Sequence, residues 1–259
     1  MSSVKYLRPV RPLHFPCSEP EDEKVPQGRR HHHLCNALYQ IIRAAIPIES
    51  GTLGADQYVY FQANNPKRCL APDVFVKAGV PDGEDFDSWM CWERGAPDVA
   101  FEVLSPSDSY ERWTLRQKLA RYAEVGVKEL YVFNVDAKEG TRLRAWDRKS
   151  GDFVERLVKK ERTRSAILGV ELYLDAVYAE GKTYPCCLRA RRIVDGTTIV
   201  FPTADERART AEEKARAAKA AARAAAASQR EAEASQREAE ARVAALEAEL
   251  ARLREGGRS

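Results

Sequence analysis

The sequence predicts an α/β protein in which a mixed sheet is flanked by helices and followed by one long C-terminal helix. Two observations carry this prediction. Before Pro202, short apolar runs of strand length alternate with segments of helical periodicity, the order typical of a mixed sheet covered by helices. After Pro202 the chain is almost entirely Ala, Arg, Glu and Gln until Gly256, and these residues favour helix. We therefore predict an irregular segment over residues 1–28, an α/β domain over 29–200 and a helix over 203–255.

The composition excludes several classes of protein. The 259 residues are 44% hydrophobic, which is enough for a core, and their formal net charge of +3 excludes a strongly basic nucleic-acid-binding arm and an acidic solvating protein. No apolar run is long enough to span a membrane, and the first residues show no secretory signal. The six cysteines form no C-x-x-C pair, so we expect free thiols and a cytoplasmic protein.

The first half of the α/β domain combines one helix with three strands. Prolines recur through residues 1–28 and predict irregular structure there. From Arg29 an apolar face predicts a helix that Pro47 ends, and this face consists of Leu34, Leu38, Ile41, Ile42 and Ala45. Three strand-like runs follow, at residues 57–61, 73–77 and 98–104.

The second half begins with a helix predicted over residues 110–125. Leu115, Leu119 and Tyr122 share one face of this helix, and Gly126 is a typical C-cap. A strongly apolar strand is predicted at residues 129–135, and a hairpin joins residues 142–146 to 153–155.

The C-terminal segment has a seven-residue repeat, because residues 228–234 recur directly as 235–241. Apolar side chains at 243, 246, 250 and 253 have the spacing of the a and d positions of a coiled coil. The same register places Gln229 and Gln236 at a positions and Ala at d positions, which makes a weak seam. We expect a homo-oligomer held together near the C-terminal leucines, with a solvated single helix as the alternative.

Acidic residues lie at and within the predicted strands. Asp73 and Asp98 each follow a proline at the start of a strand, and strand alternation places Glu102 on the same face as Asp98. Lys118 lies on the following helix, with Tyr122 one turn later. If the second and third strands pair, two carboxylates and a lysine can meet, as metal-assisted phosphodiester hydrolysis requires. The alternatives are a turn or cap role for Asp98 and a buried ion pair between Glu102 and Lys118.

Three stretches, at residues 70–76, 96–107 and 118–127, together resemble the Uma2 family of bacterial proteins. This family is placed among the restriction-endonuclease-like PD-(D/E)XK proteins. The resemblance covers roughly residues 25–190, and the run Glu-Val-Leu-Ser-Pro-Ser at 102–107 is its most specific part. It implies a restriction-endonuclease-like fold, whereas function has to be argued from the site itself.

The resemblance also implies roles for particular residues. Asp73 matches the aspartate of the PD motif and Glu102 the acidic residue of (D/E)XK, so the two would hold Mg²⁺ or Mn²⁺. Leu104 stands where that motif has its lysine, and Lys118 matches a lysine that has moved to the next helix. Related nucleases often carry an acidic residue on the first helix, but residues 31–45 contain none. Asp98 is a further candidate ligand.

These features lead to three hypotheses of different classes. The first is a Mg²⁺-dependent DNA endonuclease in which Asp73 and Glu102 hold the metal, Lys118 assists the attacking water and Tyr122 buttresses the lysine. The second is a catalytically inactive module of the same fold that recruits partners through its coiled coil, which the Leu104 substitution favours. The third is a structural protein whose main part is the long helix.

Two further clusters indicate structural roles. Consecutive helical residues point about 100° apart, so His31, His32 and His33 cannot share one ion well, and we expect a helix start with one packed histidine. The arginines at 189, 191 and 192 are expected to form a solvated rim, with contacts to phosphates as the alternative.

Overall fold

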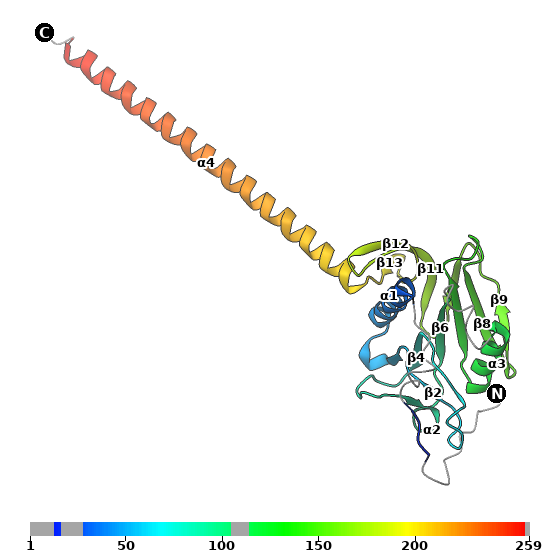
Figure 1. Cartoon of the computed structure of the whole chain (residues 1–259). Helices are drawn as coiled ribbons and strands as arrows, with labels where there is room; N and C mark the ends of the chain where they lie inside the picture. The colour runs from blue at the N-terminus through cyan, green and yellow to red at the C-terminus, as the bar shows by residue number, and fades with distance from the viewer. Residues whose placement is uncertain (1–12, 17–27, 105–113, 257–259) are drawn as a thin grey trace. The chain divides into compact units, whose positions relative to one another are not determined.

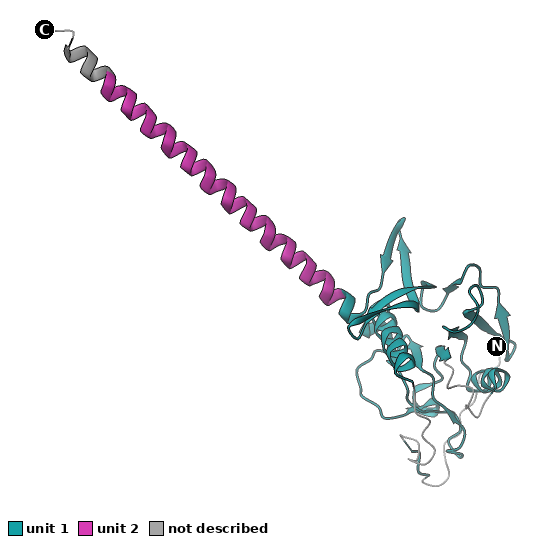
Figure 2. Cartoon of the chain, turned by 45° about the horizontal axis from the view of Figure 1, so that its top comes forward, with its two compact units in different colours: residues 1–206 teal, residues 207–259 magenta. Residues whose placement is uncertain are grey.

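The computed structural model describes residues 13–16, 28–104 and 114–256, and only the backbone of residues 250–256 (Figure 1). The chain divides into two compact units, residues 1–206 and residues 207–259 (Figure 2). The predicted fold class is confirmed, because unit 1 combines helices with mixed sheets and a long helix follows. Among the described residues, no helix combines the length and the apolar character that crossing a membrane requires.

A six-stranded sheet forms the centre of unit 1, with the strand order β1-β4-β6-β7-β8-β9. Neighbouring strands are antiparallel except β6 and β7, which are parallel and are joined by helix α3. The predicted strands of the α/β domain from residue 73 onward and the predicted hairpin are all present. The bounds are β1 Gly51–Gly54, β4 Val74–Ala78, β6 Val99–Leu104, β7 Glu129–Asn134, β8 Leu143–Lys149 and β9 Asp152–Arg156.

Helix α1 (Arg29–Ala45) covers one face of this sheet, as its apolar face predicts. Leu34, Leu38, Ile41 and Ile42 are almost fully buried in a core that includes Val99, Phe101 and Val103 of β6. The alternate residues of β6 face the other way, because successive side chains of a strand point to opposite faces. Glu102 therefore lies on the face opposite to α1.

A second, antiparallel sheet packs against the same core and was not predicted. Its strands are β10 (Arg162–Ser165), β11 (Val170–Ala179), β12 (Lys182–Val194) and β13 (Thr197–Val200), in that order. Leu172 and Leu188 belong to the core that contains the apolar face of α1. Helix α1 is therefore buried by both sheets, which fixes the position of its first turn.

Helix α3 (Leu115–Val125) covers the other face of the six-stranded sheet. Its Tyr122 and Val125 are buried with Ala100 of β6 and with Leu130 and Val132 of β7. Residues 110–113 of the predicted helix lie outside the described residues. The helix ends at Gly126, which has the left-handed conformation of a C-cap and donates its N–H to the Tyr122 carbonyl.

The segment at residues 57–61 differs from its prediction. Only β2 (Val59–Tyr60) is a strand, and it pairs with β3 (Cys69–Leu70) and β5 (Trp89–Met90) in a small separate sheet rather than in the central one. Helix α2 (Cys91–Arg94) follows β5, and the short helix η1 (Ile48–Ser50) precedes β1. Trp89 and Val59 of the small sheet are buried against Phe75, so this sheet covers the face of the central sheet that carries Phe75.

The prediction of a solvated arginine rim is wrong. Arg189 is buried and its guanidinium binds the Glu206 carboxylate. Arg191 pairs with Glu171, and Arg192 donates to the Ala45 carbonyl at the end of α1. These arginines hold the second sheet together and against α1.

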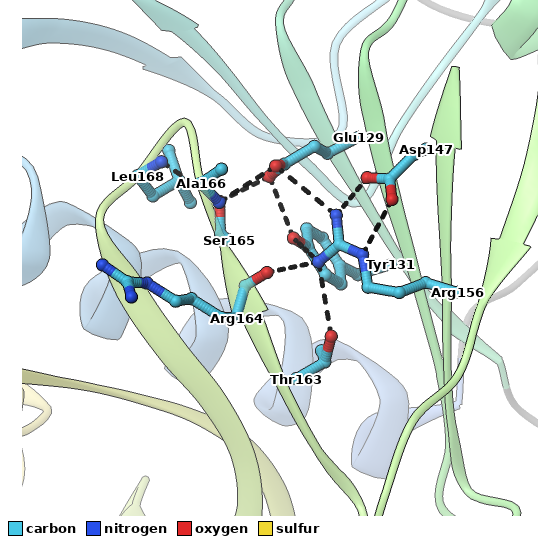
Figure 3. A network of polar contacts seen from close by, with 9 residues as sticks. All are labelled: Glu129, Tyr131, Asp147, Arg156, Thr163, Arg164, Ser165, Ala166 and Leu168. Atoms are coloured by element: carbon cyan, nitrogen blue, oxygen red, sulfur yellow. Dashed lines mark hydrogen bonds and ion pairs between the residues drawn. The ribbon is translucent and has the colours of Figure 1, made fainter. Parts of the chain in front are cut away.

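A buried polar network ties the central sheet to β10, with Glu129 at its centre (Figure 3). The Tyr131 hydroxyl donates to Glu129 Oε2 over 2.9 Å and the Ala166 N–H donates to Oε1 over 3.0 Å. Arg156 joins Glu129 to Asp147 and to the Arg164 carbonyl. Glu129 is buried, so these partners offset the cost of removing its charge from water.

Helix α4 (Ala204–Gly256) begins at a reciprocal cap. The Thr203 hydroxyl accepts from the Glu206 N–H over 3.1 Å, and the Glu206 carboxylate accepts from the Thr203 N–H over 3.0 Å. Beyond this first turn, the described side chains of α4 are solvent-exposed from Arg207 to Glu249. The five described cysteines are present as thiols, as expected.

Candidate active site

The site forms where β4 and β6 pair. The antiparallel register ends where Val74 lies opposite Phe101, and Asp73 is the residue just before β4. Its carboxylate is close enough to Glu102 of β6 for its charge to raise the pKa of that residue. The two carboxylates predicted from the sequence are therefore brought together at this edge of the strand pair.

Helix α3 supplies the two other predicted side chains. Thr114 caps the helix in a capping box with Gln117, which fixes the first turn. Lys118 follows directly, and its Nζ lies 2.7 Å from Glu102 Oε2. One turn later the Tyr122 hydroxyl donates to Glu102 Oε1. The structure thus places Tyr122 and Lys118 on the same carboxylate, that of Glu102.

Burial dominates the electrostatics of Glu102. Its side chain is only 7% exposed in the middle of β6. The pKa of Glu102 is raised to about 7, because burial and the negative charge of Asp73 together outweigh Lys118 and Tyr122, which act in the opposite direction. The ionised carboxylate is costly in this position, and a nearby cation would lower that cost.

Asp73 is held from two directions. Its Oδ2 accepts the Val103 N–H over 2.6 Å, which ties the carboxylate to the backbone of β6. Its Oδ1 lies 3.2 Å from Nε2 of His31, on the first turn of α1. The expectation of one packed histidine is wrong, because His31 and His33 are both buried; His33 binds Tyr184 on β12.

His31 and its neighbour Cys35 were not identified as site residues from the sequence. Cys35 Sγ lies 3.3 Å from His31 Nε2. The first helix therefore reaches the site with an imidazole and a thiol, at the place where related nucleases often carry an acid. The sequence signal was present in the helical spacing of 31 and 35, but nothing in it showed that this face reaches Asp73.

Asp98 lies away from this group. Its carboxylate accepts the Ala78 N–H over 3.0 Å and pairs with Lys77 at 3.2 Å and Lys128 at 2.6 Å. Glu102 lies four residues further along the chain, which corresponds to about 13 Å in an extended strand. This arrangement corresponds to the structural alternative for Asp98. Leu104, at the motif's usual lysine position, packs against the core beneath α3.

The donor set suits a divalent cation with oxygen ligands. Asp73 and Glu102 each offer carboxylate oxygens, and a carboxylate oxygen that accepts one hydrogen bond retains a second lone pair. The ammonium of Lys118 compensates only one of the two negative charges at the site. A doubly charged ion between the carboxylates fits both the chemistry and the charge balance of the residues present.

Comparison with known proteins identifies one family. A family model described as Uma2, putative restriction endonuclease, matches residues 22–173, more than half of the chain. The matched segment contains α1, β4, β6 and α3, which are the elements that carry the site. No curated protein matches the chain.

Proposed function

The chain belongs to the Uma2 family, and on this premise we propose that it is a Mg²⁺-dependent endonuclease that hydrolyses phosphodiester bonds in DNA. The observation that carries the proposal is the contact between Lys118 of α3 and Glu102 of β6, beside the charge of Asp73. An ammonium beside two facing carboxylates is the set of groups that metal-assisted phosphodiester hydrolysis requires.

Asp73 and Glu102 would hold Mg²⁺ or Mn²⁺. A bound divalent ion lowers the pKa of a ligated water and neutralises negative charge that develops on the phosphoryl oxygens. The Val103 N–H fixes the orientation of Asp73, and Tyr122 fixes that of Glu102. Both carboxylates are thus held in place before substrate arrives, which reduces the reorganisation needed during the reaction.

Lys118 would act on the attacking water and on the phosphate. Its ammonium is half-buried and lies within hydrogen-bonding distance of Glu102, so a water beside both groups would be oriented by the pair. A cationic group at this point also offsets the negative charge on the oxygens of the five-coordinate phosphorus in the transition state. The capped first turn of α3 positions the lysine from the helix rather than from the strand.

The test is cleavage of supercoiled plasmid DNA by the purified full-length protein with Mg²⁺ or Mn²⁺. We expect nicking or linearisation, and a loss of about 10²–10⁴-fold in Asp73→Asn and in Lys118→Met, because each removes a group that acts on the reaction. Lys128→Met is the matched control, since Lys128 is 65% exposed and pairs with Asp98. This control should cleave like the wild type.

Folding of each variant is checked by circular dichroism and thermal melting. The proposal is wrong if the wild type cleaves neither plasmid nor single-stranded DNA at any metal concentration, or if folded Lys118→Met cleaves as fast as Lys128→Met. DNA binding without cleavage would instead favour the inactive module of the same fold.

A further inference from the structure

A second group of potential ligands adjoins the carboxylates on the α1 side. His31 and Cys35 lie one helical turn apart, so their side chains project from the same face of α1. His31 Nε2 lies 3.2 Å from Asp73 Oδ1 and 3.3 Å from Cys35 Sγ. The three ligand atoms all lie within 4.8 Å of one another. An imidazole, a thiol and a carboxylate therefore converge at one point.

These separations are close to those of a tetrahedral metal site. With metal–nitrogen, metal–oxygen and metal–sulfur bonds of about 2.0–2.3 Å, neighbouring ligand atoms stand about 3.4–3.6 Å apart. The two distances from His31 Nε2, 3.2 and 3.3 Å, are only slightly shorter. The third separation, between Cys35 Sγ and the Asp73 carboxylate, is at most 4.8 Å, so an ion would draw these two side chains together.

We propose that His31, Cys35 and Asp73 form a binding site for a thiophilic transition ion of the Zn²⁺ class. Thiolate and imidazole suit Zn²⁺ and Co²⁺, whereas Mg²⁺ takes oxygen ligands. Because Asp73 belongs to both sets of ligands, the thiophilic ion competes with Mg²⁺ for this carboxylate. The competition rests on the proposed nuclease function, whereas the binding of the ion does not.

The surroundings of the three residues favour a cation. The side chains of His31 and Asp73 are only 6% and 12% exposed, so water screens their interactions weakly. The Glu102 carboxylate adds negative charge close by and is itself bonded to Lys118. Burial and the Asp73 charge raise the pKa of Cys35, so without an ion this residue is a thiol, and coordination releases its proton to solvent.

The binding is tested by titrating the full-length protein with Co²⁺ and recording its absorption spectrum. A thiolate ligand produces a sulfur-to-cobalt charge-transfer band in the near ultraviolet. We expect this band in the wild type and its loss in Cys35→Ser, with Zn²⁺ displacing Co²⁺ from the wild type. Cys69→Ser is the matched control, because Cys69 is also a half-buried thiol but lies on β3.

The imidazole is tested in the same way with His31→Gln and the control His33→Gln, a second buried histidine of α1. His31→Gln should weaken Co²⁺ binding at least tenfold, and His33→Gln should not. Circular dichroism confirms that each variant is folded. A missing band, or a band of equal strength in Cys35→Ser, would overturn the proposed site and leave an ordinary hydrogen-bonded cluster.

Two more variants separate this proposal from the proposed function. Asp73→Asn should lose both the Co²⁺ band and DNA cleavage, whereas Glu102→Gln should lose cleavage but retain the band. In cleavage assays, the Zn²⁺ concentration that halves Mg²⁺-dependent activity should be at least tenfold higher for Cys35→Ser than for Cys69→Ser. A band that follows these variants in a protein that does not cut DNA would refute only the nuclease function.

Discussion

Glu102 is the residue at which stability and the proposed chemistry conflict. Burial within the strand disfavours the charged form of the Glu102 carboxylate relative to the protonated form. The charged form, however, is the one that binds a metal ion. Lys118 and Tyr122 reduce this cost but do not remove it, because the pKa remains raised to about 7. The folded protein therefore holds a proton on Glu102 at pH values where the unfolded chain has released it.

The Glu102→Gln variant should change how stability depends on pH. Between the ordinary pKa of 4.5 and the folded value of about 7, the native state binds more protons than the unfolded state, so the free energy of unfolding of the wild type falls as pH rises. Glutamine mimics the protonated acid and does not titrate. The free energy of unfolding of the variant should therefore rise relative to that of the wild type over this pH window, by at most on the order of 3 kcal/mol. Urea denaturation with a chelator present measures this.

Glu155→Gln is the control, because the pKa of Glu155 is shifted in the opposite direction to that of Glu102. Its hydrogen bond with Arg144 lowers the pKa of Glu155, so its contribution to stability is present above the ordinary pKa and is lost as pH falls through the folded value. A stability difference between the wild type and Glu102→Gln that stays constant from pH 4.5 to pH 7.5 would contradict the buried, raised-pKa state of Glu102.

Gly54 shows a packing requirement at the edge of the same sheet. A Cβ built on Gly54 would lie 2.1 Å from Cζ of Phe75, so the ring on β4 occupies the space of a side chain. Gly54→Ala should therefore destabilise unit 1 by about 1–3 kcal/mol in urea denaturation, the usual cost of overpacking. Gly83→Ala, where nothing lies within 4 Å, should change stability little. Equal effects of both variants would show that the Phe75 ring moves aside freely.

The residues of the site differ in how far sequence could identify them. Asp73 was predicted because it follows a proline at the start of a strand, Glu102 because it interrupts an apolar strand, and the family motif points to both. Lys118 was predicted because it lies on the following helix and matches a lysine of the same family. His31 was missed because three adjacent histidines project in directions about 100° apart, and only the packing of α1 between two sheets selects which one faces Asp73.

At the scale of elements, helix α3 carries Lys118 and Tyr122, so its formation places two residues of the candidate site. Local patterns were sufficient to predict α1, α3 and the strands of the central sheet from β4 onward. They were insufficient for the second sheet, because its β12 arginines find partners far along the chain, such as Glu206 for Arg189 and the Ala45 carbonyl for Arg192. Helix α3 is the opposite case, since its start depends on two residues, Thr114 and Gln117, within one turn.

Thr114→Ala should loosen the start of α3. Loss of an N-cap costs about 1 kcal/mol, which for a unit of this size lowers the melting temperature by about 2–4 °C. Lys118 lies one helical turn after Thr114, and its N–H donates to the Thr114 carbonyl. A looser first turn therefore displaces Lys118, so the rate of DNA cleavage should also fall severalfold. Arg116→Ala, at an exposed position on the same turn, is the control. If both variants melt and cleave alike, the cap does not position Lys118.

At the scale of the whole molecule, α4 is a long helix whose described apolar side chains have no covering partner within unit 2. Val243 and Leu246 are 56% and 53% exposed. At the polar a positions, Gln229 and Gln236 donate to glutamates one turn later on the same helix. These bonds keep the glutamines on their own helix, so a stable seam between two copies depends on the apolar residues nearer to Gly256.

We predict that two copies associate through this seam and that Leu246→Lys disrupts it. A leucine at a d position contributes about 1.5–3 kcal/mol when a partner helix buries it, whereas two lysines facing each other would repel and would have to remain hydrated. Sedimentation equilibrium should give a dimer or higher oligomer for the wild type and a monomer for Leu246→Lys. Ala248→Lys, at the outward f position of the same heptad, should retain the wild-type mass.

Because a dimer can present two active sites to a duplex, Leu246→Lys should also cut both plasmid strands less often per nick than Ala248→Lys. A monomeric wild type at every concentration, or equal masses for the two lysine variants, would mean that the heptad spacing reflects helix composition and not a seam.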